Sequence, residues 1–412
     1  MCREDSKIVS HWNDLPTIPL NIDVIIDDTT LRDGIQMPGT AVSPEDAAHI
    51  AYLLDLIGVE RIELHQYQKP DQEAIKLIQK RGLNAKIATW CRAVKKDIDI
   101  ALSLDVGEIG ISHPVSHIHL KAKWPDKSED ELINRVVEAV EYARDHGLVV
   151  FVHGEDSTRA KWSFERSFIN AVADAGASVY RICDTIGVAT SFPEAPLPNG
   201  IFAKIRAIKR ETKIPNIEIH AHDDLGNAVE NTMAAIRAAN GLYDKIFVST
   251  TVLGMGERAG NAETEKVIVN LYFHHGFRKF EHGLSRLKEL ADFVSAATGV
   301  VIPPNKAIVG TYAFAHESGI HTHGVLRDAR TYEFIPPELV GNTRRISIGK
   351  QSGKAVIRYK AEEVLGRKID EDDPRILRLV ELVRSLYASG ERKSSLKEEE
   401  FKKLMVEAGF KL

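Results

Sequence analysis

The sequence is poor in cysteine, since only Cys2, Cys91 and Cys183 occur among its 412 residues. Their spacing matches no metal motif, and three thiols are too few for a disulfide framework. The sequence also lacks a run of about 18 uncharged apolar residues, the length that a membrane span needs, and its polar N-terminus has no apolar signal-peptide core. We therefore expect a soluble protein of the reducing cytoplasm without a membrane partner.

A strong charge of either sign is lacking as well. The formal net charge is −5 without marked asymmetry, so neither nucleic acid nor an anionic membrane is indicated as a partner. The segment GMGERAGN, residues 254–261, has the spacing GxGxxxG rather than GxGxxG, which argues against a Rossmann dinucleotide site. What remains is a globular composition, with 43% apolar and 27% charged residues, in a chain long enough for one large domain and smaller additions.

Short apolar runs alternate with amphipathic stretches over the first 276 residues. Several amphipathic stretches begin at a capping residue such as Ser43 or Ser128 and end at a glycine such as Gly58 or Gly147. Repeated βα units predict a parallel sheet, and eight of them favour a closed (β/α)8 TIM barrel, with a doubly wound open sheet as the alternative. The eight strand-like runs are residues 24–28, 61–64, 85–89, 108–112, 149–153, 179–184, 217–222 and 246–251.

The pattern changes after Gly276, where helical stretches and a loop-rich segment replace the βα units. The expected fold class is therefore α/β, a (β/α)8 TIM barrel followed by a mainly helical C-terminal subdomain. We predict an N-terminal arm (1–22), the catalytic barrel (23–276), a linker and subdomain carrying His321 and Tyr332 (277–354), and a C-terminal helical subdomain (355–412).

Polar residues follow the ends of most predicted strands, and in a barrel these ends form the active-site face. The seventh strand carries His220 and His222, which point to one face because they are two residues apart. Two imidazoles and one carboxylate make a metal site with open positions. Asp33, after the first strand, is the preferred carboxylate, with Asp27 and Asp28 as alternatives. Two histidines packed in the barrel are the competing interpretation.

Other polar residues have weaker signals. His117 and His119 form a second HxH pair in the predicted loop after the fourth strand, which favours a structural or substrate-proximal role. Asn261 follows a glycine-rich turn and is placed to reach a metal or its water. His321 and Tyr332 lie in the loop-rich segment, where a surface position and a direct role are both open.

Six motifs, in this order, resemble those of a known family. The family comprises the acetyl-CoA-dependent 2-oxoacid condensing enzymes, namely 2-isopropylmalate, homocitrate, citramalate and Re-type citrate synthases. It belongs to a superfamily of metal-dependent barrels that includes hydroxymethylglutaryl-CoA lyase. The similarity spans residues 27–354 and implies an acyltransferase of carboxylic-acid or amino-acid metabolism. The motifs are DTTLRDGIQ, EDSTRA, CDTIG, HAHDDLGNAVENTMAAIRA, GMGERAGNAETE and ESGIHTHGVL.

The resemblance also implies a set of ligands. A divalent cation, Mg²⁺, Mn²⁺ or Zn²⁺, would be held at the positions of Asp33, His220 and His222. Acetyl-CoA would be the co-substrate, and a 2-oxo acid the acceptor. The residues expected to contact the acceptor are Gln36, His65, Arg92 and Thr185.

Four residues carry the implied catalytic roles. Arg32 would stabilise negative charge on the substrate oxygen, and Glu155 matches a position near the acetyl methyl group. His321 and Tyr332 match an acid–base pair that the C-terminal subdomain supplies in this family, often from the other chain of a homodimer. The enolate of acetyl-CoA then attacks the ketone, and hydrolysis of the thioester gives a 2-hydroxy-2-carboxymethyl acid and CoA.

The sequence also bears on the acceptor. Ile35 stands where most such synthases have a glutamate, which removes one negative charge beside the acceptor. Arg92, His65 and Arg159 offer positive charge. We therefore expect a dianionic acceptor, either 2-oxoglutarate, giving homocitrate, or oxaloacetate, giving citrate. A 2-isopropylmalate or citramalate synthase is the alternative.

Two other classes of function are less expected. A metal-dependent lyase or aldolase would use the same metal site, but Glu257 and Arg258 occupy the glycine-rich loop in which the lyase carries a cysteine. A barrel that only binds ligands needs no catalytic set. The complete implied set is nevertheless present, namely Arg32, Asp33, His220, His222 and His321.

Overall fold

The computed structural model of the chain describes residues 16–412. Contacts divide it into two compact units, one spanning Thr17–Ile302 and the other including Pro303–Leu412. The first unit is larger and carries the sheet, and the second is mainly helical. The predicted N-terminal arm lies largely outside the described residues.

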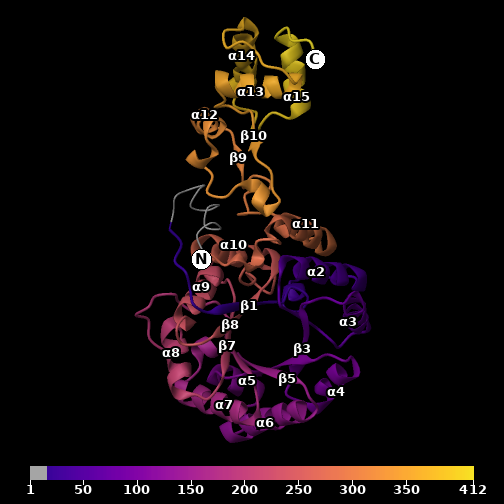
Figure 1. Cartoon of the computed structure of the whole chain (residues 1–412), viewed down its shortest axis with the longest axis vertical. Coiled ribbons are helices and arrows are strands. Elements are labelled where there is room, and N and C mark those ends of the chain that lie inside the picture. The colour runs from indigo at the N-terminus through magenta and orange to yellow at the C-terminus, as the bar shows by residue number, and fades with distance from the viewer. Residues whose placement is uncertain (1–15) are drawn as a thin grey trace, which may run out of the picture. The chain divides into compact units, whose positions relative to one another are not determined.

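Eight parallel strands close into a barrel in sequence order, with β1 paired to both β2 and β8. Helices lie outside the ring of strands (Figure 1). Every predicted strand overlaps one of these strands, so the predicted TIM barrel is confirmed. The strands are β1 (Asp23–Asp28), β2 (Arg61–Leu64), β3 (Lys86–Arg92), β4 (Glu108–Pro114), β5 (Val149–Glu155), β6 (Val179–Asp184), β7 (Asn216–Ala221) and β8 (Lys245–Thr250).

The strands are buried on both faces, as parallel barrel strands are. In β7, Ile217 and Ile219 alternate with Glu218 and His220, and all four are buried. The apolar residues face the surrounding helices, whereas the polar ones face the barrel interior. The side-chain period of two therefore decides which residues reach the site.

Ten helices of the barrel unit surround these strands in the described chain. The predicted caps are confirmed for α2, where the Ser43 side chain accepts from the Asp46 N–H and Gly58 is left-handed. The helices are α2 (Pro44–Ile57), α3 (Lys69–Arg81), α4 (Lys95–Ser103), α5 (His117–Lys123), α6 (Glu129–Asp145), α7 (Trp162–Ala175), α8 (Ile201–Glu211), α9 (Ala228–Ala239), α10 (Thr264–His275) and α11 (Leu287–Thr298). Five 3₁₀ turns join them: η1 (Gly34–Gln36), η2 (Ser157–Arg159), η3 (Val252–Gly254), η4 (Arg278–Phe280) and η5 (Leu284–Arg286).

The C-terminal unit has its own apolar core, built from buried residues such as Ile357, Leu379 and Phe401. A two-stranded parallel sheet joins β9 to β10. The elements are β9 (Ala315–His316), α12 (Gly319–Arg327), η6 (Ala329–Thr331), η7 (Pro337–Val340), β10 (Arg345–Ile346), α13 (Lys354–Leu365), α14 (Pro374–Ala388) and α15 (Glu398–Glu407). Within residues 16–412, none of the helices has the length and apolar character to span a bilayer.

Candidate metal centre and surrounding polar sites

The end of β1 turns sharply into the barrel mouth. The N–H groups of Arg32, Asp33 and Gly34 all donate to the carbonyl of Thr29, which folds the chain back directly after the strand. Arg32 and Asp33 are both buried, at 6% and 5% exposure. Adjacent side chains of a regular strand would point to opposite faces. This turn lets both face the same cluster.

Asp33, His220 and His222 form a candidate metal centre. One ligand atom from each lies within 4.8 Å of the others. The two histidine Nε2 atoms are 3.2 Å apart, and they lie 3.5 Å and 3.9 Å from Asp33 Oδ2. Two imidazole nitrogens and one carboxylate oxygen on one side of a divalent ion leave open positions for a substrate.

The surrounding contacts fit a metal held by these three residues. Ser249 Oγ lies 2.8 Å from His220 Nδ1, so this ring nitrogen can donate to the hydroxyl while Nε2 faces the cluster. Asn261 donates to Asp33 Oδ2 at 2.7 Å and to the Met255 carbonyl at 3.0 Å. Its buried Oδ1 has no hydrogen-bond partner among the described residues. An ion or its water would satisfy that oxygen.

The electrostatics of the cluster favour cation binding. Burial opposes ionisation of Asp33, but Arg32 and His220 outweigh it and hold the pKa of this carboxyl well below its usual range. Burial lowers the pKa of His222 to about 3, and His220 adds to this effect. An anionic carboxylate and a neutral imidazole are the forms that coordinate metals.

A second polar cluster, the interior ion network, lies on the same strands. Arg61 Nη2 is 2.9 Å from Asp27 and 2.5 Å from Glu218. Arg181 Nη2 pairs with Glu63 at 2.7 Å, with Glu218 at 2.9 Å, and also with Asp27. All five side chains are buried. This network was not predicted from the sequence, although the charged residues at alternate positions of apolar strands indicate buried ion pairs.

The carboxylates of Asp27 and Asp28, the alternatives to Asp33 as a metal ligand, are held by other partners. Asp27 belongs to it, and Asp28 accepts hydrogen bonds from the Thr30 N–H and the Thr264 hydroxyl. Arg32 links the two clusters, because it donates to Asp33 at 2.6 Å and to Glu63 at 2.5 Å. Only Asp33 therefore directs a carboxylate toward the histidine pair among these three aspartates.

The four residues expected to contact the acceptor differ in how far other residues already occupy their polar groups. Gln36 Nε2 lies 3.3 Å from His65 Nε2, so the two polar groups share one place on the rim. Thr185 accepts a hydrogen bond from the Asp156 N–H at 2.8 Å. Arg92 makes a bidentate pair with Asp97, and its side chain is 61% exposed. Its positive charge is therefore already largely offset.

Glu155, at the end of β5, is held by residues of α5. His119 Nδ1 lies 3.1 Å from Glu155 Oε1, and Lys123 Nζ donates to both carboxylate oxygens at 2.8 Å and 2.7 Å. His119, expected in a loop, thus lies on a short helix beside a predicted catalytic carboxylate. Lys123 was not among the residues predicted from the sequence.

His321 and Tyr332 belong to the C-terminal unit. The structure brings them together, with ring centroids 4.3 Å apart. Both side chains are exposed, Tyr332 at 48%. The two rings are tilted by 37° to each other, so an imidazole and a phenol, both groups that can transfer protons, lie side by side in this unit.

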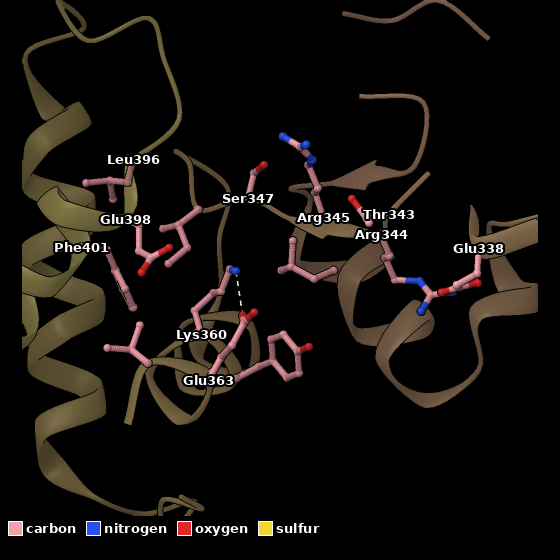
Figure 2. Close-up of a pocket in the computed structure, with 14 residues that line it drawn as sticks. Glu338, Thr343, Arg344, Arg345, Ser347, Lys360, Glu363, Leu396, Glu398 and Phe401 are labelled. Atoms are coloured by element: carbon pink, nitrogen blue, oxygen red, sulfur yellow. Dashed lines mark hydrogen bonds and ion pairs between the residues drawn. The ribbon is translucent and has the colours of Figure 1, made fainter. Parts of the chain in front are cut away.

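A cavity of about 660 Å³ lies in the C-terminal unit, between β10, α13 and α15 (Figure 2). Its charged groups are mostly paired, since Lys360 contacts Glu363 at 2.7 Å and Arg344 contacts Glu333 at 2.6 Å. None of the predicted site residues is among the described residues that line it. Within the C-terminal unit, the cavity is thus lined by residues other than His321 and Tyr332.

Two family models match the chain. The HMGL-like family matches residues 23–294, which is most of the barrel unit. The homocitrate synthase post-HMGL domain-like family matches residues 308–389 of the C-terminal unit. A solved structure, the HMG-CoA lyase of Bacillus subtilis, superposes with a TM-score of 0.57 at 19% identity, covering 69% of this chain and 97% of that one. At this identity the likeness shows the shared fold.

Curated relatives resemble the chain more strongly. The 2-isopropylmalate synthase of Methanocaldococcus jannaschii is 40% identical over 95% of this chain and 72% of the relative. An (R)-citramalate synthase of the same organism is 40% identical over 85% and 68%, and the homocitrate synthase of Methanopyrus kandleri is 38% identical over 90% and 89%. The chain is thus an enzyme that belongs to the HMGL-like family, together with these 2-isopropylmalate, citramalate and homocitrate synthases.

Proposed function

We propose that the protein condenses acetyl-CoA with a 2-oxo acid and releases CoA by hydrolysis of the thioester. The observation that carries this proposal is the cluster of Asp33, His220 and His222 with the Arg32 guanidinium beside it. An anionic metal site next to a fixed cation suits a 2-oxo acid, whose carboxylate and keto oxygens are adjacent. The curated synthases among the relatives support the same reaction class.

The residues of the chain then have separable roles. A bound divalent ion, Mg²⁺, Mn²⁺ or Zn²⁺, would act as a Lewis acid on the 2-oxo acid. Arg32, which is held by Glu63 and Asp33, offers its remaining N–H groups to the oxygen that gains negative charge. Glu155 lies at the end of β5, on the active-site face of the barrel, where it can accept or orient a proton from the acetyl methyl group.

The C-terminal unit completes the proposed acid–base chemistry. His321, which contacts Tyr332, would act together with Glu155, either as the base itself or by orienting the base, and Tyr332 would donate a proton. We propose that they serve the barrel of the other chain in a homodimer. Mixing a His220→Ala variant with a His321→Ala variant tests this arrangement. Activity rising to about a quarter of the wild-type value would support it. Random reassembly makes about half of the dimers mixed, and each mixed dimer has one intact site and one site that lacks both residues.

For the acceptor, we propose a 2-oxo acid with a second carboxylate, such as 2-oxoglutarate or oxaloacetate. The adjacent Gln36 and His65 support this choice, because amide and imidazole N–H groups can hold a carboxylate on the rim. Arg92 and Arg159 contribute less than the sequence implied, since Asp97 and Asp156 already pair with them. Monoanionic acceptors leading to 2-isopropylmalate or citramalate are the competing outcome.

Release of free CoA from acetyl-CoA tests the proposal directly. The purified protein, loaded with each of the three cations in turn, is offered 2-oxoglutarate, oxaloacetate, 2-oxoisovalerate and pyruvate. Efficient release with either diacid supports the full proposal. Release with 2-oxoisovalerate or pyruvate alone would retain the reaction class but overturn the proposed acceptor. The absence of release with all four would overturn the condensing function.

A further inference from the structure

The short helix α5 is fastened to the end of β5 by its own cap. The Ser116 hydroxyl caps α5 by accepting from the His119 N–H and also hydrogen-bonds Asp156. The Val115 N–H donates to the Glu155 carbonyl at 2.8 Å. These contacts fix the position of α5 relative to two consecutive carboxylates, Glu155 and Asp156.

The side chains of α5 complete this arrangement. Lys123 binds both oxygens of Glu155, and His119 binds one of them. The other ring nitrogen of His119, Nε2, lies 3.7 Å from Asp156 Oδ2. Asp156 is fully buried and is also paired with Arg159 at 2.8 Å. Three basic side chains therefore surround two acidic ones at the mouth of the barrel.

We propose that His119 and Lys123 are positioning residues for Glu155 in the condensation reaction. This inference rests on the proposed function. Glu155 alone is a flexible side chain at a strand end, with 27% of its surface exposed. Two donors on one helix restrict its carboxylate to a single orientation. Such restriction matters because about 1 Å of misplacement can cost on the order of 100-fold in rate.

The chemistry assigned to these two residues is indirect. When the acetyl methyl C–H bond breaks, its proton passes to the base and its electron pair delocalises onto the thioester oxygen. His119 and Lys123 form and break no covalent bond in this step. They fix the carboxylate that accepts or directs the proton, and the Lys123 ammonium offsets the negative charge that develops nearby.

Substitutions on α5 distinguish this role from substrate binding. We expect Lys123→Met and His119→Phe to lower kcat about 30- to 100-fold, with the KM for acetyl-CoA changed by less than about threefold. The conservative variants Lys123→Arg and His119→Asn keep a donor and should recover most of kcat. Lys121→Met is the matched control, since Lys121 is exposed on the same helix; it should retain wild-type kinetics.

A deuterium isotope effect gives a second readout that a structural role would not move. With trideuterated acetyl-CoA, the isotope effect on kcat should rise in Lys123→Met and His119→Phe, because proton removal becomes more nearly rate-limiting. A raised KM with unchanged kcat would overturn the inference and indicate a CoA contact. Equal losses in the conservative variants, or wild-type rates throughout, would also overturn it. Lack of CoA release by the wild-type protein overturns the proposed function, and this inference with it.

Discussion

Two buried polar clusters share the same barrel strands but differ in how their charges are satisfied. In the interior ion network, every carboxylate pairs with an arginine that is itself fully enclosed. In the candidate metal centre, Asp33 has only Arg32 as a permanent cation, and its other neighbours are two histidines and an amide. In the first cluster the arginines compensate the carboxylates, although atoms such as Asp27 Oδ1 and Arg181 Nη1 have no hydrogen-bond partner among the described residues. In the second, the amide oxygen of Asn261 beside Asp33 has no such partner in that part of the chain.

This difference indicates that the interior ion network is structural, whereas the candidate metal centre binds a ligand. Burial of an ion costs several kcal/mol unless a partner compensates it, so a network in which arginines pair with the carboxylates holds the barrel interior in one arrangement. An incompletely compensated cluster is tolerated where a ligand completes it. The strand β7 illustrates both outcomes, because Glu218 belongs to the interior ion network and His220, two residues later, belongs to the metal centre.

The sharpest way to test the comparison is to remove a metal ligand. We expect His220→Ala to lower kcat by at least about 1,000-fold, because both metal binding and substrate polarisation depend on it. The metal-free variant should lose little stability, since it removes no charge pair of the interior ion network. CoA release, Mn²⁺ titration calorimetry and urea unfolding measure the three quantities. Near-normal activity, or unfolding of the metal-free variant, would contradict this assignment.

A substitution in the interior ion network should have the opposite profile. We expect Glu218→Gln to lower the free energy of unfolding by about 3 to 5 kcal/mol, because it leaves buried arginines short of a counter-charge. Metal stoichiometry should remain unchanged under conditions in which the variant is folded. Urea unfolding and metal titration of the same preparation measure both effects.

A matched pair of variants controls for the loss of charge itself. Glu131→Gln removes a carboxylate whose surface pair with Lys127 is about half exposed, and it should destabilise the protein far less than Glu218→Gln. If Glu218→Gln cost no more than Glu131→Gln, the interior ion network would not be the scaffold that its geometry suggests.

The sequence was sufficient for the fold because each βα unit carries its own signal. These signals are read within a short stretch of sequence: the alternation of a strand, a helix N-cap such as Ser43 and a helix-ending glycine such as Gly58. Eight repeats of them leave few alternatives to a closed barrel. The interior ion network was not predictable in the same way. It depends on strand register, which places Arg181 beside Glu218 and Asp27 beside Arg61, and one sequence does not reveal that register.

The two HxH pairs of the barrel unit show why the site was only partly predictable. His220 lies on β7 and His222 directly follows its end, where the chain is still extended, so the residues at positions i and i+2 share a face and converge. On α5 the same spacing turns about 200° around a helix, so His119 reaches Glu155 while His117 lines a separate surface cavity. The identity of the element, rather than the motif, decides which histidines meet.

The smallest expected effect concerns Asn261, at the edge of the metal centre. It binds Asp33 Oδ2 and the Met255 carbonyl, and therefore orients a ligand without belonging to the three-residue set. We expect Asn261→Ala to weaken metal affinity about 10- to 100-fold, as the loss of such a supporting contact typically does. At saturating metal, kcat should fall less than in His220→Ala. Unchanged metal affinity would show that the Asn261 contact to Asp33 is dispensable. An effect equal to that of His220→Ala would indicate that Asn261 is itself a metal ligand. Either outcome would contradict the supporting role that we assign to Asn261.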